Sequence, residues 1–438
     1  MSGYFEKGLF VLGKVLQSID MSMPTTSQSY ISIFLHRLQY KIHEIINPIG
    51  KTTGLTDHQL FKIDTCWSAA LSLSMVDTIR GLDFQCRHLV LALQSGEPYR
   101  IGRALALEAA FSALSGNKSL GKTRLLLERS SQLAQTSNNP HAKALLMLVV
   151  GVVASLEGRW SEAQSALEKA EKTLSQITGV VWELTTARYF WFFSMTWMGE
   201  YAAISQRMES LFNFLQRSEN LYAYTVLQQC SFITHLAADQ PDKALQATAN
   251  AMKKWQYQGF HIQKLWDTIV KTHTALYLND GLKAWEEITA FWSNTSKVFL
   301  FQTQYLKINF LRINAFCALS AAQASSNRKT FLKTAYKNAN MIEKENTTWG
   351  DGFVKLIKAS IAYQNKEQGK SILLLEKAEE SFSKANMKTY MVALQHYRGL
   401  IIGGEKGQRL ITSASEYLKQ QGVKNIDCMC RMLAPGFG

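Results

Sequence analysis

Residues 115–124, SGNKSLGKTR, carry a spacing of side chains that could bind nucleotide phosphates. Gly116 and Gly121 enclose four residues and are followed by Lys122 and Thr123, which matches the G-x-x-x-x-G-K-T pattern of a phosphate-binding loop. In such a loop the backbone N–H groups surround the phosphates, the lysine reaches the outer phosphates and the hydroxyl binds magnesium. This chemistry requires a β-strand that leads through the loop into the first turn of a helix.

The segments on both sides of this motif predict helices. RALALEAAFSAL (103–114) precedes it and is rich in alanine and leucine at helical spacing, and TRLLLERSSQLA (123–134) follows it. No later apolar strand ends in an aspartate that could hold magnesium, because ALYLND (275–280) ends a predicted helix. We interpret the motif as an accidental match in a turn between two helices, and we expect the protein to use no cofactor.

Other arrangements of catalytic or metal-binding side chains are weak. The histidines lack the HExxH spacing, and neither G-x-S-x-G nor G-x-G-x-x-G occurs. Cys428 and Cys430 would supply two metal ligands, but no second pair of cysteines or histidines lies near them in the sequence. We therefore expect neither a metal site nor an enzyme.

The composition favours a helical protein with a large core. The chain has 438 residues, of which 47% are hydrophobic, and only 6 prolines and 26 glycines interrupt it. Six scattered cysteines and an N-terminus without a secretory signal indicate reduced cysteines and a cytoplasmic protein. The longest apolar run, ALLMLVVGVVASL (144–156), is shorter than the roughly 20 residues that cross a bilayer, so we expect no membrane span.

The net charge of +14 raises the question of an anionic partner. It arises from 48 lysines and arginines against 34 acidic residues, and it would suit nucleic acid or an acidic protein. The basic residues are spread along the chain without a run of four. We interpret them as a solvated surface and keep nucleic-acid binding as the alternative.

Apolar residues recur at helical spacing almost throughout, and the predicted helices come in pairs joined by short turns. Ala163, Ala203, Ala244 and Ala284 hold similar positions in the second helices of successive pairs, 40 to 41 residues apart. The predicted pairs span 145–170, 191–215, 233–255, 274–292, about 299–345, 361–382 and 397–418. This pattern predicts an all-α fold, an α-solenoid of antiparallel helix pairs whose units are like tetratricopeptide (TPR) repeats but have a period of about 40. The aromatic residues between Trp182 and Trp197 are expected to form core between repeats.

The N-terminal 60 residues are less regular than the rest. Two amphipathic helices are predicted there, over about 4–19 and 28–46. We expect residues 1–60 to form an N-terminal cap or docking segment and residues 61–438 to form the repeat array.

Part of the chain resembles a known protein family. Residues 63–110 contain W-S-A-A (67–70), S-M-V-D (74–77) and G-E-P-Y-R-I (96–101), and the chain ends in RMLAPGFG (431–438). These segments resemble the helical C-terminal region of large bacterial serine/threonine protein kinases, which join a kinase domain and a signalling-type ATPase domain to TPR-like repeats. The sequence has no kinase glycine loop, H-R-D or D-F-G, so no catalytic residue of that family carries over. It also departs from the family before the terminus, where Asn425 is followed by Ile426 rather than by proline.

The resemblance and the repeat pattern together favour a protein-interaction module. A solenoid offers a concave surface lined by first helices, and Arg188, Lys264, Lys271 and Lys307 are polar positions on such helices. Lys264 and Lys271 lie seven residues apart and share a helix face. We expect these four residues to line a groove for an acidic or C-terminal peptide, with a kinase or ATPase as the partner that the resemblance implies. Nucleic-acid binding and, less favoured, nucleotide binding through Gly116–Thr123 remain the alternatives.

Overall fold

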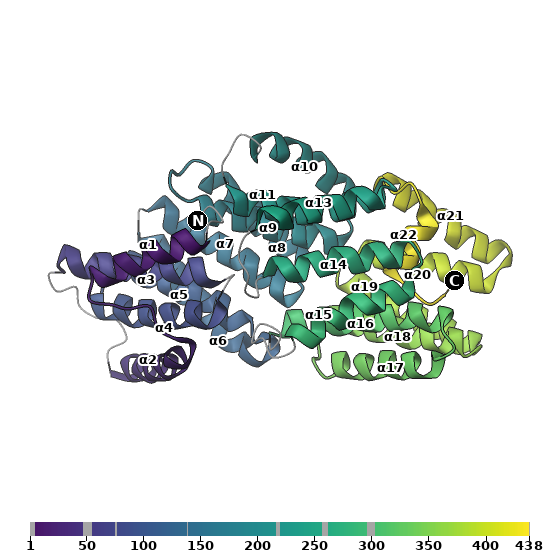
Figure 1. Cartoon of the computed structure of the whole chain (residues 1–438), viewed down its shortest axis with the longest axis horizontal. Coiled ribbons are helices and arrows are strands. Elements are labelled where there is room, and N and C mark those ends of the chain that lie inside the picture. The colour runs from purple at the N-terminus through teal and green to yellow at the C-terminus, as the bar shows by residue number, and fades with distance from the viewer. Residues whose placement is uncertain are drawn as a thin grey trace. The chain divides into compact units, whose positions relative to one another are not determined.

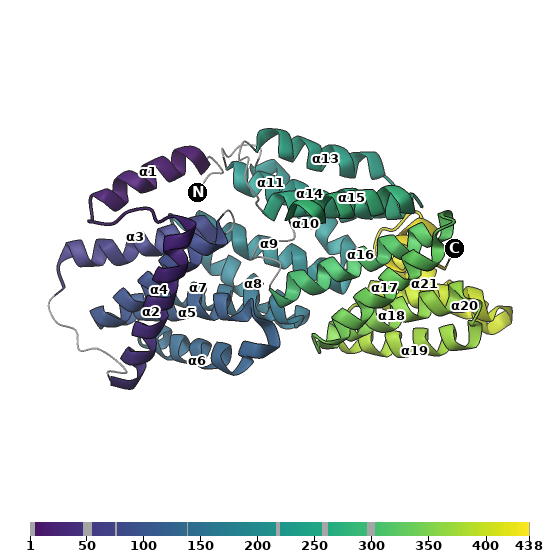
Figure 2. The ribbon, with the colours of Figure 1, turned by 60° about the horizontal axis from the view of Figure 1, so that its bottom comes forward.

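The computed structural model describes residues 5–437 except for 47–54, 75–76, 138, 216–219, 256–261 and 296–302. Throughout the described residues the regular structure is helical, and consecutive helices pack as antiparallel pairs joined by short turns (Figures 1 and 2). The predicted all-α fold of α-solenoid type is thus confirmed. Met75 and Val76 of the S-M-V-D segment, and residues 299–302 of one predicted pair, lie outside the described residues.

The chain forms two compact units. Unit 1 consists mainly of the residues up to Leu156 together with Ser165–Arg188, and unit 2 mainly of Glu157–Gln164, Tyr189–Trp255 and Gln263–Gly438. Residues 1–60, which the sequence sets apart as a cap or docking segment, belong to unit 1, and the predicted array is divided between both units.

Unit 1 is built on the packed pairs α3–α4 and α5–α6, with α2 lying along α4. Its helices are α1 (Phe5–Gln17), α2 (Thr26–Ile46), α3 (Asp57–Ser74), α4 (Thr78–Ser95), α5 (Pro98–Ala113), the short 3₁₀ helix η1 (Gly116–Ser119), α6 (Leu120–Thr136) and α7 (Pro140–Glu157). Side chains cap two of these helices. The Asp77 carboxylate accepts a hydrogen bond from the backbone N–H of Arg80 at the start of α4, and Glu97 caps α5 in front of Pro98.

The helices α8 (Trp160–Leu174) and α9 (Val181–Met198) are shared between the two units. The remaining helices belong to unit 2: α10 (Tyr201–Leu215), α11 (Leu221–Cys230), α12 (Phe232–Ala237), α13 (Pro241–Lys254), α14 (Ile262–Tyr277), α15 (Gly281–Thr295), α16 (Gln304–Ala324), α17 (Arg328–Glu343), α18 (Thr348–Gln364), α19 (Gln368–Lys384), α20 (Lys388–Ile402), α21 (Gly404–Gln420) and α22 (Ile426–Leu433). Among them α16–α17, α18–α19 and α20–α21 are packed pairs.

The turns before nine helices share one backbone feature. A residue with positive φ stands two positions before the first residue of the next helix, and in eight of the nine turns it lies within three residues of the end of the preceding helix. The nine residues are Gly96, Gly158, Gly179, Gly199, Asp239, Asn279, Asn346, Lys366 and Asn386. Eight are glycine, asparagine or aspartate, the types that adopt this conformation at least cost. The repeat is therefore encoded in its turns as much as in its helices.

The alanine register is confirmed at three of its four positions. Ala163, Ala244 and Ala284 are fully buried, each three residues after the first residue of its helix. In α10 the equivalent residue is Ile204, which is fully buried, whereas Ala203 is only half-buried. The sequence alignment of this repeat was therefore wrong by one residue.

An aromatic cluster forms the core of unit 2 around the buried Arg312. The Trp160 ring stacks on Trp197 at a centroid distance of 5.6 Å, and Trp349 lies 5.8 Å from Trp197. The Arg312 guanidinium lies 5.2 Å from the Trp197 ring centre and donates a hydrogen bond of 3.1 Å to the Tyr390 hydroxyl. The prediction that the aromatic run of α9 is core is confirmed for Phe190–Phe193 and Trp197, whereas Trp182 and Tyr189 are half-buried.

The C-terminal segment folds back into unit 2. Phe437 packs between Tyr363 and Tyr397, at ring-centroid distances of 5.3 and 5.0 Å. The Ser360 hydroxyl donates a hydrogen bond of 2.9 Å to the carbonyl oxygen of Pro435. The RMLAPGFG segment is thus part of the core of unit 2.

One titratable group in this core predicts acid sensitivity. Burial, reinforced by the charge of Arg312, lowers the pKa of His273 from its ordinary 6.5 to about 3, although its Nδ1 is bonded to the carbonyl of Ile269. The folded state therefore holds a neutral imidazole, and its stability is fully present above pH 6.5 and is lost as the pH falls toward 3. Between about pH 6.5 and pH 5 this one group costs about 2 kcal/mol of unfolding free energy.

The variant His273→Gln keeps an N–H donor but does not titrate. Urea unfolding at about pH 6.5 and about pH 5 measures the free energy of unfolding of both proteins. On acidification this free energy should fall less for the variant than for the native chain. Equal losses in the two proteins would contradict the burial of a neutral His273.

Within the described residues, α7 is long and apolar enough to cross a membrane by length and composition, and half of it is buried. The longest apolar run of the sequence lies in this helix.

Candidate docking surface on helix α2

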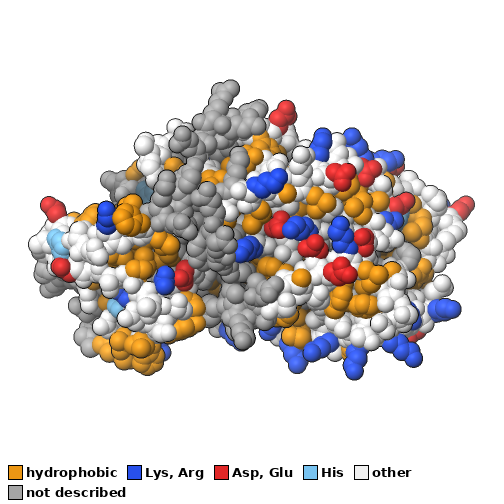
Figure 3. All heavy atoms as spheres, in the orientation of Figure 1, with side chains coloured by type: hydrophobic (Ala, Val, Ile, Leu, Met, Phe, Trp, Pro, Cys, Tyr) orange, Lys and Arg blue, Asp and Glu red, His pale blue; other side chains and the backbone are white. Residues whose placement is uncertain are grey.

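Helix α2 exposes most of its large apolar side chains and turns several polar ones inward. Ser29, Ser32, His36 and Arg37 are buried or half-buried together with Ile33 and Tyr40, while six apolar residues are exposed. These are Tyr30 (54% exposed), Ile31 (64%), Phe34 (69%), Leu35 (50%), Leu38 (48%) and Ile42 (46%), and we call them the α2 apolar face. Figure 3 shows a cluster of hydrophobic side chains over α2, at the lower left.

Two fully buried carboxylates on neighbouring helices fix this orientation. The Ser32 hydroxyl donates a hydrogen bond of 2.5 Å to Asp83 on α4, whose carboxylate is also held by Arg87 at 2.8 Å. The guanidinium of Arg37 forms an ion pair with Glu108 on α5. Burial alone would lower the pKa of Arg37, but the Glu108 carboxylate more than reverses this effect and holds that pKa above its ordinary value.

Turning α2 to bury its apolar residues would be costly. Asp83 and Glu108 are completely inaccessible to solvent, and the rotation would remove Ser32 and Arg37 from them. Glu108 would keep Lys122 and Asp83 would keep Arg87, so each of the two lost contacts costs about 1 kcal/mol. The polar face is therefore committed to the interior, and the apolar side chains stay at the surface. Contiguous exposed apolar patches of a few hundred Å² mark interaction sites.

The phosphate-loop look-alike takes part in this anchor. Gly116 lies in η1, between α5 and α6, so the predicted turn between two helices is confirmed. The Lys122 ammonium lies 2.9 Å from the same Glu108 carboxylate oxygen that Arg37 contacts. The Thr123 hydroxyl is buried and donates a hydrogen bond of 3.0 Å to the Ser112 hydroxyl. The lysine and the hydroxyl that would bind phosphate and magnesium thus have internal partners, and Gly121 lies inside α6.

We expect no binding of magnesium–ATP at this motif. The lysine is held by Glu108 and no strand precedes the turn, so the geometry that surrounds phosphates is not formed. Isothermal titration of the purified chain with magnesium–ATP should give no saturable heat. Binding that Lys122→Ala abolishes, with α-helical content unchanged, would show that the motif is functional.

Three of the four basic residues predicted to line a peptide groove contact carboxylates of their own chain. Arg188 lies 2.8 Å from Glu171, Lys271 lies 2.8 Å from Asp267, and Lys307 forms an ion pair with Glu345. Lys264 is half-buried on α14, the helix that also carries Lys271.

These pairings change the electrostatics that the sequence suggests. Arg188 belongs to unit 1 and the three lysines belong to unit 2. Burial lowers the pKa of Arg188, while Lys271 has a raised pKa because Asp267 outweighs the opposing effect of burial. These ion pairs leave the predicted groove less free positive charge than the sequence suggests. The acidic partners were not apparent in the sequence, since they lie up to 38 residues away in the chain. The peptide groove stays a prediction.

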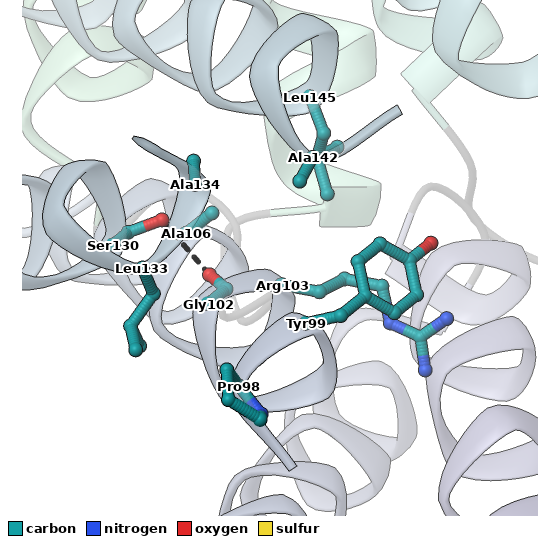
Figure 4. A pocket seen from close by; sticks show the side chains of 10 residues that line it. All are labelled: Pro98, Tyr99, Gly102, Arg103, Ala106, Ser130, Leu133, Ala134, Ala142 and Leu145. Carbon is teal, nitrogen blue, oxygen red and sulfur yellow. Dashed lines mark hydrogen bonds between the residues drawn. The ribbon is translucent and has the colours of Figure 1, made fainter. Parts of the chain in front are cut away.

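A small, shallow hollow lies among α5, α6 and α7. Figure 4 shows Ser130 bonded to the carbonyl of Gly102 at 2.8 Å and the Arg103 side chain running beside Tyr99, away from Ser130 and Leu133. The Arg103 guanidinium forms an ion pair with Asp64. Among the described residues the Arg103 Nε has no hydrogen-bond partner, but the Ser130 hydroxyl, the Tyr99 hydroxyl and the Arg103 Nη2 are paired within the chain and the rest of the wall is apolar. The hollow therefore offers no set of polar groups that would orient a metabolite.

In the described part of the chain, no group of three or more histidine, cysteine, aspartate or glutamate side chains is placed to hold a metal ion. All six cysteines are free, and burial raises the pKa of the Cys430 thiol.

Comparisons with known proteins add no assignment. The chain matches no protein-family model, and the searches of curated proteins and of solved structures give no match.

Proposed function

We propose that this protein is a non-catalytic protein-interaction module and that the α2 apolar face is one of its binding surfaces. The observation that supports this most is the outward orientation of the α2 apolar face, which contacts of Ser32 and Arg37 with buried carboxylates hold in place. A helix that exposes six large apolar side chains presents a surface suited to a helix or groove of a protein partner.

The charge distribution of α2 favours protein over lipid as the partner. Helices that lie in a membrane interface carry lysine and arginine on the polar face that meets the lipid headgroups. The polar face of α2 packs on α4 instead, and Arg37 reaches α5 through its ion pair with Glu108. Lys41 remains as an exposed cation beside the apolar face.

The resemblance to kinase-associated repeat regions suggests the kind of partner. We propose that the module acts in signalling in the cytoplasm and that the bound protein is a kinase or an ATPase. The six free cysteines suit a reducing compartment.

The test compares a substitution that introduces a negative charge into the α2 apolar face with a matched control elsewhere on the surface. Phe34→Asp places a carboxylate in the α2 apolar face, and Leu400→Asp makes a similar change at a leucine on α20 that is 56% exposed. Tagged native chain and both variants would be used to capture partners from lysate, with and without nuclease. Each captured protein would then be purified and its affinity for the three chains measured.

We expect Phe34→Asp to weaken the reconstituted interaction at least about tenfold, because a desolvated carboxylate would oppose apolar contacts, and Leu400→Asp to leave it unchanged. Equal affinities for all three chains would contradict the use of this surface. Partners that vanish with nuclease would point to nucleic acid instead.

Nucleic-acid binding is the second candidate because of α17. Lys329, Lys333 and Lys337 recur every four residues on this helix and are exposed, and no acidic residue lies between 328 and 342. Figure 3 shows a row of basic side chains along the lower edge of unit 2, over α17. If this stripe binds nucleic acid, affinity for a mixed-sequence RNA or DNA should fall steeply with salt, and Lys333→Glu should reduce both the affinity and the salt slope. Affinity that Lys333→Glu leaves unchanged would exclude the stripe.

A further inference from the structure

We propose that the α2 apolar face binds α2 of a second copy of this chain, with the two helices antiparallel about a two-fold axis level with residue 36. The proposal rests on the proposed function, because it names the occupant of the same surface. Four observations carry it: the spacing of the apolar residues, their symmetric order, the position of Lys41 and the area that the pair would bury.

The spacing is that of a helix-pairing seam. Ile31, Phe34, Leu35, Leu38 and Ile42 follow one another at intervals of three, one, three and four residues, which keeps them in one stripe along α2. With Tyr30 the stripe extends over 12 helical steps, about 18 Å. Seams of this spacing pack against another helix at a small crossing angle.

The order of side chains along the stripe is self-complementary. In an antiparallel pair centred on residue 36, Tyr30 of one copy is level with Ile42 of the other, and Phe34 is level with Leu38. Each aromatic ring therefore faces a smaller aliphatic side chain, and Leu35 lies next to the axis. Each of these contacts occurs twice, as an isologous interface requires.

The exposed charge favours the antiparallel order over the parallel one. Within residues 26–42, which carry the α2 apolar face, there is no acidic side chain to pair with Lys41. A parallel pair would place the two Lys41 side chains at the same level, where like charges repel. In the antiparallel pair they are level with Ile31 of the other copy, and ten helical residues separate them by about 15 Å along the axis.

The area is sufficient for a specific dimer. The six side chains of the α2 apolar face are 46% to 69% exposed. At about 100 Å² each they supply about 600 Å² per copy, or about 1,200 Å² for the pair, which reaches the lower end of specific interfaces. Figure 1 shows α2 at the lower edge of unit 1, and in Figure 2, where that edge is turned forward, α2 lies in front of the other helices of the unit.

Sedimentation equilibrium of the purified full chain tests the association. From about 1 to about 100 µM the native chain should shift toward twice the 49.4 kDa mass of one chain. Phe34→Asp should remain monomeric over this range, Leu400→Asp should dimerise like the native chain, and far-ultraviolet circular dichroism should show equal helix content in all three. A dimer that Phe34→Asp leaves intact would overturn the proposal.

Cysteine cross-linking tests the geometry, in a Cys428→Ser background because Cys428 is the one cysteine among the six that is not buried. Under mild oxidation Leu35→Cys should cross-link to itself. Chains with Tyr30→Cys should cross-link to chains with Ile42→Cys when the two are mixed, and much less when each is alone. Efficient cross-linking of Ile42→Cys alone would indicate parallel pairing and overturn the proposed geometry.

The two proposals fail separately. If the native chain stays monomeric at about 100 µM while Phe34→Asp still abolishes binding of a captured protein, the self-pairing is overturned and the interaction function stands. If the native chain is monomeric and Phe34→Asp changes no interaction, both are overturned.

Discussion

Replacing Gly158 with alanine is expected to lower the free energy of unfolding of unit 2 by about 2–5 kcal/mol. Gly158 ends α7 with a φ of +82°, a conformation that costs an L-residue about 1–2 kcal/mol. A Cβ at this position would also overlap the indole ring of Trp349, which is 1% exposed and cannot move outward. Such overpacking costs about 1–3 kcal/mol more. Urea unfolding followed by tryptophan fluorescence measures the loss.

Gly422→Ala is the matched control for this prediction. Gly422 has a φ of +80° and belongs to the same unit, but no atom lies within 4 Å of a Cβ built there. Only the backbone cost of about 1–2 kcal/mol applies to it. Adding Trp349→Leu to Gly158→Ala should remove the overlap between the new Cβ and the indole ring. The backbone cost at residue 158 and the loss of packing caused by the smaller leucine side chain would remain. If Gly158→Ala and Gly422→Ala destabilise equally, Trp349 does not pack against the turn as described.

Removing both cations that hold Glu108 is expected to destabilise unit 1 by about 3–5 kcal/mol. In Arg37→Ala or Lys122→Ala the Glu108 carboxylate keeps one ion-pair partner, and the loss should stay near 1 kcal/mol. In the double variant a carboxylate that is completely inaccessible to solvent has neither cation. The losses should therefore be strongly non-additive. Chemical unfolding of the four chains in a double-mutant cycle measures the coupling.

The rescue variant separates this explanation from general damage to α2. Adding Glu108→Met to the double variant removes the buried charge and should recover most of the lost stability. The triple variant should also release α2 from α5, so that hydrogen exchange of the α2 amides becomes faster while that of α4 is unchanged. Additive losses in the cycle would show that Glu108 does not depend on these two cations.

The helices and their turns could be predicted from the sequence because both depend on local chemistry. Apolar spacing predicts the helices, and glycine, asparagine or aspartate occupies eight of the nine left-handed turn positions. Lys366 is the exception and carries no such signal. The register of α10 was misjudged by one residue because Ala203 and Ile204 are both apolar, and only packing decides which of them is buried.

The orientation of α2 could not be predicted in the same way. Its amphipathic pattern shows which residues share a face, but not which face is inward. The decision comes from Asp83 and Glu108, which lie 51 and 71 residues from their α2 partners in the sequence. The carboxylate that pairs with Lys307 of the predicted groove was missed for a similar reason, since Glu345 is 38 residues from Lys307 in the sequence. Long-range ion pairs leave no periodic trace in a single sequence.

The aromatic core around Arg312 has an optical consequence. Of the ten tryptophans, Trp67 and Trp182 belong to unit 1 and the other eight to unit 2. Intrinsic emission therefore reports almost entirely on unit 2, and energy transfer among the closely stacked indoles couples their signals into one. In a chain with Trp67→Phe and Trp182→Phe, tryptophan fluorescence would report on unit 2 alone, whereas ellipticity would report on the helices of both units. Coincident melting curves from the two signals would show that the units melt together, and separate curves that they melt in sequence.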